Sequence, residues 1–175
     1  MEIKIELMKI KVTSLCVVFL FVFTNNICAE ERGLYFTKKK YTDQELPTYI
    51  EIKDQLPVPI LEKDQEWIDL YWKAWEIAFS QLKSPSKESP FVSNWIDEGL
   101  TEQIFQWDTN FMVLFGRYAH HIFPFIESHD NFYISQHEDG MICRVINEPD
   151  GEDHWWGLGS NFARTINPPL FAWAE

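Results

Sequence analysis

The segment from Thr109 to Phe123 (TNFMVLFGRYAHHIF) is the feature that most constrains the fold of this chain. Its residues are apolar nearly all round a helix, and only Arg117, His120 and His121 interrupt them. A helix without a polar face has to be surrounded by other elements. The pattern therefore predicts a buried helix over 109–123, with further helices packed around it.

A second helix is predicted over 64–82, because apolar residues recur there at helical spacing and Asp64 can cap the start. Its polar stripe, which includes Glu66, Asp69, Lys73 and Glu76, indicates that one side faces water. The tryptophans of this helix are expected to pack a helical core; they are Trp67, Trp72 and Trp75.

A third helix is predicted from Pro124 to about His137, with Gly140 placed to end it and an extended segment over 141–146. The tight link at Pro124 makes this helix an antiparallel neighbour of the buried one. The long connections, about 83–107 and 139–166, are then expected to emerge at one end of the scaffold. Long loops gathered at one end are where a site is expected.

The last residues, Asn167-Pro168-Pro169-Leu170-Phe171-Ala172-Trp173-Ala174-Glu175, have the pattern of a helix start followed by one apolar turn. A helix of this length does not hold itself together in water. We therefore expect a mainly α fold in which residues 63–175 are the front part of a larger helical domain.

The N-terminal region, residues 1–29, has the layout of a secretory signal. Lys4, Lys9 and Lys11 precede a short apolar run that ends near Ala29. The prediction is export to the periplasm or the outside of the cell, with no stable membrane span after signal removal. A retained membrane anchor and a lipidated Cys28 are the alternatives. Residues 30–62, charge-rich and punctuated by prolines, are predicted to be an extended lead-in.

Charge and cysteine content exclude several kinds of partner. The net charge of −12 argues against nucleic acid and anionic membranes. Past the signal Cys143 is the one cysteine left, so no internal disulfide is expected, and a small apolar role is favoured over a reactive thiol. The histidines have no recognised ligand spacing and no phosphate-binding loop is present, so neither a metal nor a cofactor is predicted.

The two long connections are rich in aromatic and polar residues that suit a sugar. An indole ring can stack on the apolar face of a sugar, while carboxylate and amide groups bind its hydroxyls. For the tryptophans a purely structural packing role is the alternative, and Asp108 can equally cap the buried helix. The candidate substrate-binding residues are Gln106, Trp107, Asp108, Arg144, Trp155, Trp156 and Asn167.

Three motifs resemble a known family. Gln106-Trp107-Asp108-Thr109-Asn110-Phe111 resembles the Trp-Asp-(Ser/Thr)-x-Phe signature of the six-hairpin, or (α/α)6, glycoside hydrolases. The likeness is to the trehalase-like and family sixty-three-like groups, including mannosylglycerate-hydrolase-like domains. The segment Asp139–Arg144 is similar to their Asp-Gly-x-Ile segment, and Asn167–Trp173 to their Pro-Pro-x-x-Ala-Trp helix opening.

The resemblance implies the N-terminal portion of an (α/α)6 barrel, about two helical hairpins, over residues 63–175. It implies that Trp107 and Asp108 line the subsite of the sugar being cleaved, with Asn167 at its rim. The family hydrolyses glycosidic bonds with inversion, using two carboxyl groups about 6.5–9.5 Å apart. Both come from later segments of the barrel, so no catalytic residue is assigned here. The expected function is an inactive front part of an exported glycosidase; the alternatives are a non-catalytic carbohydrate-binding protein and a subunit that completes its barrel with a separate chain.

Overall fold

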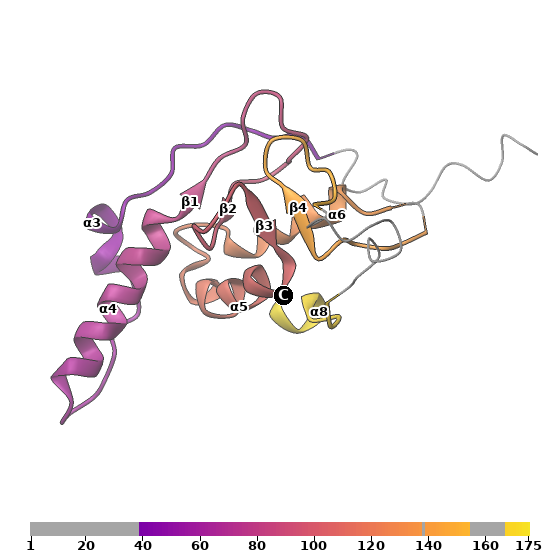
Figure 1. Cartoon of the computed structure of the whole chain (residues 1–175). Helices are drawn as coiled ribbons and strands as arrows, with labels where there is room; N and C mark the ends of the chain where they lie inside the picture. Colours follow the sequence, from indigo (N-terminus) through magenta and orange to yellow (C-terminus); the bar gives the residue numbers. More distant parts are fainter. Residues whose placement is uncertain (1–38, 138, 155–166) are drawn as a thin grey trace, which may run out of the picture. The chain divides into compact units, whose positions relative to one another are not determined.

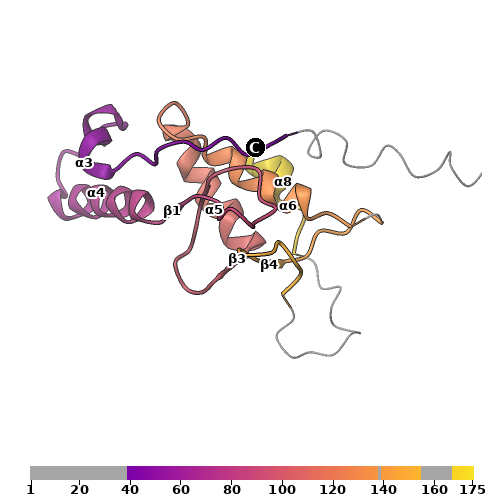
Figure 2. The same cartoon turned by 90° about the horizontal axis from the view of Figure 1, so that it is seen from above.

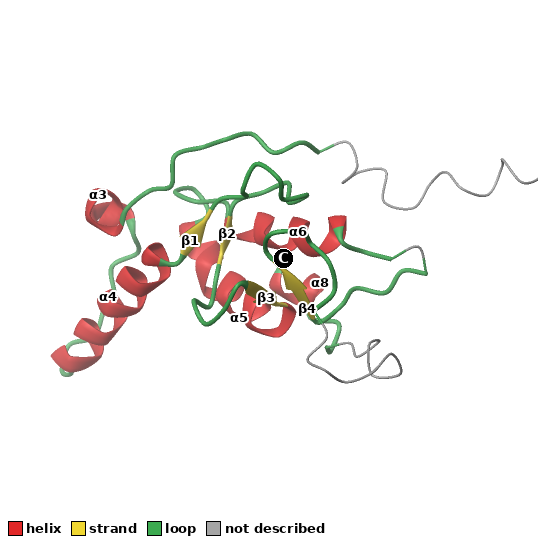
Figure 3. Ribbon diagram, turned by 45° about the horizontal axis from the view of Figure 1, so that its top comes forward, coloured by secondary structure: helices red, strands yellow, loops and turns green. Residues whose placement is uncertain are grey.

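The computed structural model describes residues 39–137, 139–154 and 167–175, which all belong to one compact unit that spans Tyr35–Glu175. The predicted signal segment 1–29 lies outside the described residues, and so do Trp155 and Trp156. The described part is a mixed helical structure with five α-helices and two small sheets (Figures 1 and 3). None of the helices in these ranges is long and apolar enough to cross a membrane.

The elements follow the chain in a simple order. The α-helices are α3 (Tyr49–Ile52), α4 (Gln65–Ser80), α5 (Gln106–Gly116), α6 (Asp130–Ile134) and α8 (Phe171–Ala174). The 3-10 helices are η1 (Lys53–Gln55), η2 (Arg117–Ala119) and η3 (Phe125–His129). The strands are β1 (Leu82–Lys83), β2 (Trp95–Ile96), β3 (Gln103–Phe105) and β4 (Val145–Asn147).

Helix α4 confirms the predicted second helix almost to its ends, with Asp64 in the N-cap position. Its buried residues are Trp75, Ala78 and Phe79, and Trp72 is half-buried against the same core. The expectation for Trp67 was wrong, because this side chain is exposed and does not pack in the core. The lead-in also differs from its prediction, since it contains α3 and η1 rather than extended segments alone.

The predicted buried helix is shorter and begins earlier than expected. Its α-helical part is α5, and the chain tightens into η2 after Gly116. The predicted third helix is divided into a 3-10 turn, η3, and the short α6. The close packing expected around Pro124 is confirmed, because α5 and η3 lie against each other and Gly116 faces the ring of Phe125.

Two sheets join parts of the chain that are far apart in sequence. Strand β1 pairs with β2, and β3 pairs with β4, in both cases antiparallel. The second pair connects the two long connections that the sequence placed at one end of the scaffold, and Figure 2 shows β3 and β4 side by side.

Two groups of buried side chains form the core. One lies between α4 and η3 and includes Trp75, Phe79, Ile96, Phe123 and Phe125. The other lies under β3, β4 and α6 and consists of Phe91, Trp95, Ile104, Phe132, Cys143 and Ile146. Cys143 is fully buried, and burial raises the pKa of its thiol, which agrees with the predicted apolar role.

Candidate functional site

The start of α5 is held in place by the antiparallel pair of β3 and β4. Phe105 pairs with Val145, and the backbone N–H of Gln106 donates to the carbonyl of Arg144 at 2.8 Å. Because of this bond, the Trp-Asp motif on α5 lies directly beside the end of the Asp-Gly-x-Ile segment. The structure thus brings together two of the motifs that the sequence analysis singled out.

Helix α5 is polar on its buried face and aromatic on part of its exposed face. Gln106, Thr109 and Asn110 are buried, and an oxygen of each has no hydrogen-bond partner among the described residues. In contrast, Trp107 is 42% exposed and Phe111 is 43% exposed. The prediction that this helix is buried all round was therefore wrong for the face that carries these two rings.

A close contact marks one end of the buried face. Gly116 lies so near the ring of Phe125 that only a small residue fits there. The other buried positions of α5 carry polar residues and Val113, and the rings of Trp107 and Phe111 lie on the exposed side. Exposed aromatic faces of this kind are typical of surfaces that bind a ligand or another chain.

Trp107 and Asp108 lie next to each other in the first turn of α5. The indole of Trp107 packs edge-to-face on Phe111, with ring centroids 5.2 Å apart. Asp108 is half-buried, and it does not cap the helix, because α5 begins two residues before it with Phe105 in the N-cap position. Its negative charge lies at the end of the helix where the macrodipole favours an anion.

A buried group of charged residues beside α5 was not foreseen. Asp97 follows β2 and is fully buried, and its Oδ2 lies 2.9 Å from Nζ of Lys83. The same lysine lies 2.5 Å from Oε1 of Glu148. Burial opposes the charge on Lys83, but the hydrogen bonds to Glu148 and Asp97 outweigh this effect and raise its pKa.

Glu98 is the unusual member of this region. Burial raises the pKa of its carboxyl group to about 8, and the charges of Asp97 and Asp108 act in the same direction. Glu98 is therefore protonated at neutral pH, and its carboxyl O–H can donate to Asp97. This bond gives a partner to buried oxygens of Glu98 and Asp97 that would otherwise have none. Sequence reasoning missed this pair because the adjacent Asp-Glu in a loop has the pattern of a solvated turn.

The third motif also packs against α5, through α8. Phe171 contacts the rings of His129, Phe132 and Tyr133. The hydroxyl of Tyr133 donates to Glu175 Oε1 at 2.7 Å, and Nδ1 of the fully buried His129 lies 3.5 Å from the same oxygen. Burial lowers the pKa of His129, so its ring is neutral near pH 7.

Two predicted site residues remain. Arg144 is half-buried directly before β4, with its carbonyl bonded to Gln106, and Asn167 is half-buried in the segment before α8. The last helix starts later than the pattern of 167–175 predicts, since α8 begins at Phe171 with Leu170 in the N-cap position. Trp155 and Trp156 lie outside the described residues. Within the described ranges, no group of His, Cys, Asp or Glu is arranged to hold a metal ion.

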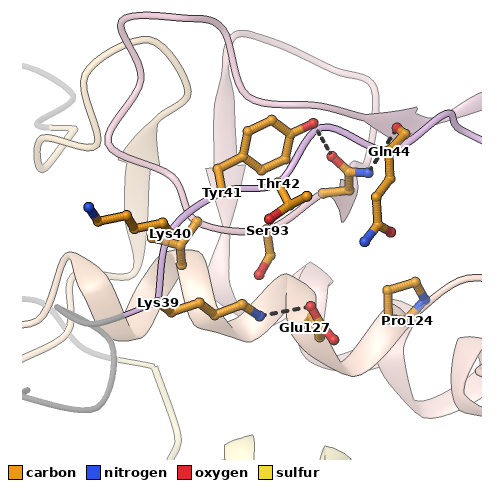
Figure 4. Close-up of a pocket in the computed structure, with 10 residues that line it drawn as sticks. Lys39, Lys40, Tyr41, Thr42, Gln44, Ser93, Pro124 and Glu127 are labelled. Atoms are coloured by element: carbon orange, nitrogen blue, oxygen red, sulfur yellow. Dashed lines mark hydrogen bonds and ion pairs between the residues drawn. The ribbon is translucent and has the colours of Figure 1, made fainter.

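A small pocket of about 100 Å³ lies where the lead-in crosses the body (Figure 4). Lys39 forms ion pairs with Glu127, at 2.7 Å, and with Asp130, while the hydroxyl of Tyr41 donates to Asn94 Oδ1 at 2.9 Å. None of the predicted substrate-binding residues lines this pocket. Its polar groups tie the lead-in to η3 and α6.

The fold and the site define a mixed helical protein whose exposed aromatic residues and buried acids gather around the start of α5. Comparisons with family models, with curated proteins and with solved structures find no match to this chain.

Proposed function

We propose that this chain is the sugar-binding front part of an exported glycoside hydrolase of the six-hairpin kind, and that by itself it binds a sugar without cleaving it. The observation that carries the proposal is the meeting of three motifs. The Trp-Asp start of α5 is hydrogen-bonded to the Asp-Gly-x-Ile segment, and the Pro-Pro-x-x-Ala-Trp segment packs through α8 against the same helix.

The chemistry at the start of α5 suits a sugar ring. Trp107 offers an exposed indole beside the carboxylate of Asp108, and this pairing of a flat apolar surface with a hydrogen-bond acceptor is what sugar recognition needs. By the resemblance, none of the three motifs carries a catalytic carboxyl group, so the role proposed for their residues is binding and not turnover.

Binding is tested with the full chain and two named probes, trehalose and maltose, by titration followed with saturation-transfer NMR and tryptophan fluorescence. We expect binding of one of them that is lost in Trp107→Ala and Asp108→Asn. The control is Trp67→Ala, which removes an indole that is even more exposed, on α4 and away from the start of α5. Binding that survives Trp107→Ala, or no binding of either probe, would contradict the proposal. Hydrolysis of p-nitrophenyl α-glucoside by the chain alone would contradict the assignment of binding without cleavage.

The aromatic face of α5 also favours a second candidate, a subunit that completes its barrel with a separate chain. Phe111 and Tyr118 are exposed on helical segments that the sequence predicts to be buried. If another chain covers them, mixing the two chains would protect these segments from hydrogen exchange and would create glycosidase activity. A partner that restores neither would rule out this candidate.

Export is proposed from residues 1–29 alone, with a lipid anchor at Cys28 as the alternative. Mass spectrometry of the mature chain separates the two, because cleavage near Ala29 leaves an unmodified N-terminus whereas lipidation adds acyl chains to Cys28.

A further inference from the structure

The pocket beneath the lead-in is built by bonds among its own residues. Residues 39–44, here called the strap, form one side of it, and the loop before β2 and the start of η3 form the other (Figure 4). The hydroxyl of Tyr41 donates to Asn94 Oδ1 at 2.9 Å, and Asn94 Nδ2 donates to the carbonyl of Gln44 at 3.5 Å. These bonds fix the strap over the pocket.

The side of the pocket opposite the strap is fixed as well. The backbone N–H groups of Val92 and Ser93 donate to the buried side chain of Asn131, at 3.1 and 3.2 Å. The hydroxyl of Ser93 donates to Asp130 at 3.1 Å. A pocket whose sides are in place before a ligand arrives binds it at a lower entropic cost.

The charged groups at the pocket are already paired with each other. Nζ of Lys39 lies 2.7 Å from Glu127 Oε2 and also pairs with Asp130. Burial opposes the charge on Lys39, but the hydrogen bonds to Asp130 and Glu127 outweigh this effect and raise its pKa. Lys40 also lines the pocket, but its exposed side chain extends away from Glu127 (Figure 4). The two carboxylates disfavour an anion and the ammonium disfavours a cation, whereas a hydroxyl group can both accept from Lys39 and donate to Glu127.

Two further polar side chains of the strap are available to a ligand. Thr42 and Gln44 line the pocket and are exposed, and their side chains make no hydrogen bond to another residue in the part of the chain that the structure describes. Figure 4 shows the side-chain amide of Gln44 directed toward Glu127 and Pro124. The ring of Pro124 and the side chain of Val92 add apolar surface to the lining, against which CH groups can pack.

The volume of the pocket sets the size of its ligand. About 100 Å³ is room for about three water molecules, each of which takes about 30 Å³ in the liquid. We propose that the pocket binds a small neutral polyol of the size of glycerol, whose hydroxyl groups bind the Lys39 ion pair and the side chains of Thr42 and Gln44. A disaccharide is too large for this volume, and the pocket shares no residue with the start of α5. The inference therefore stands apart from the proposed function.

The test is a titration of the full chain with glycerol, followed by the amide N–H signals in NMR spectra. We expect saturable shifts at Thr42, Gln44 and Ser93, with a dissociation constant of about 1 mM, because a ligand this small makes few contacts. Three control probes of similar size are 1-propanol, which has a single hydroxyl group, acetate, which is an anion, and methylammonium, which is a cation. Each control is expected to bind more weakly than glycerol.

Two variants remove the polar groups of the strap without a change of shape. Thr42→Val and Gln44→Leu should each weaken glycerol binding about fivefold, the factor that one lost hydrogen bond supplies. Gln55→Leu, the same change at an exposed glutamine outside the pocket, should bind glycerol like the unaltered chain. All three variants should unfold at the same temperature as the unaltered chain, which verifies that the fold is kept.

Three outcomes would overturn the proposal. Glycerol that produces no saturable shift at the pocket amides would show that the pocket does not take a polyol. Glycerol binding that is the same in Thr42→Val, Gln44→Leu and the unaltered chain would place the ligand elsewhere. A control probe that binds as tightly as glycerol would show that the pocket recognises charge or apolar surface and not hydroxyl groups.

Discussion

Nζ of Lys83 lies 2.9 Å from Oδ2 of Asp97, a carboxylate that is fully buried. Lys83 belongs to β1 and Asp97 directly follows β2, so this ion pair neutralises a buried charge at the end of the first small sheet. Glu148, one residue beyond β4, shares the same lysine, and the second sheet is thereby connected to the first.

Loss of this lysine should destabilise the fold. Lys83→Met leaves the buried charge of Asp97 without its partner, and removal of one member of a buried pair costs about 3 kcal/mol. The free energy of unfolding, measured by urea denaturation at pH 7, should fall by about that amount. Lys87→Met, in the exposed loop nearby, is the control and should change it by less than about 0.5 kcal/mol. Equal effects of the two variants would show that the ion pair is unimportant.

The protonated state of Glu98 makes stability depend on pH in a predictable direction. Its pKa is raised to about 8 in the folded chain, whereas the ordinary pKa of this carboxyl group, which applies to the unfolded chain, is 4.5. Between these two pH values the folded state holds a proton that the unfolded state has released. The free energy of unfolding should therefore decrease as the pH rises from about 5 to 8 and then level off.

Glu98→Gln should remove this part of the pH dependence, because glutamine keeps the neutral form at every pH. The variant and the unaltered chain should be equally stable near pH 5, and the variant should be more stable by at least about 1 kcal/mol at pH 9. Urea denaturation at a series of pH values measures both curves. Parallel curves over the whole range would show that Glu98 is ionised in the folded chain.

Gly116 should tolerate no larger residue. A Cβ atom at this position would lie 2.4 Å from Cδ1 of Phe125, although the helical backbone itself accepts alanine. Helix propensity alone would make Gly116→Ala stabilising by about 1 kcal/mol. We expect a net loss of about 2 kcal/mol instead, because overpacking of a close contact outweighs propensity. Thermal unfolding measures the sign, and Gly116→Ala combined with Phe125→Leu should recover part of the loss.

Asn131 should be required for the loop before β2. Its buried side chain accepts hydrogen bonds from the N–H groups of Val92 and Ser93, at 3.1 and 3.2 Å, and donates to the carbonyl of Ser93 at 3.1 Å. Asn131→Ala leaves these buried groups unpaired and should cost about 3 kcal/mol. Amide hydrogen exchange at Val92 and Ser93 should quicken in the variant. Asn94→Ala removes the bonds to Tyr41 and Gln44 but none to these two amides, so they should stay protected.

Local signals in the sequence determined the parts of this protein that depend on near neighbours. The spacing of apolar residues and the capping position of Asp64 predict α4 to within two residues of its ends, because both act within a few turns of one helix. The same reasoning found the close packing around Pro124, the buried Cys143 and the aromatic start of α5. Where the signal was weaker, as in the single predicted helix over 124–137, a 3-10 turn and a short helix replaced it.

Tertiary structure alone decided which faces are buried and which distant groups meet. The apolar pattern of 109–123 predicts a buried segment, but it does not say which side is covered. In the fold Gly116 lies against Phe125, whereas Trp107 and Phe111 are exposed. The pairing of β3 with β4 and the ion pairs of Lys83 join residues that no local pattern relates. Burial raises the pKa of Glu98, and burial depends on the packing of the whole fold. The adjacent Asp-Glu in the sequence does not indicate that Glu98 is buried.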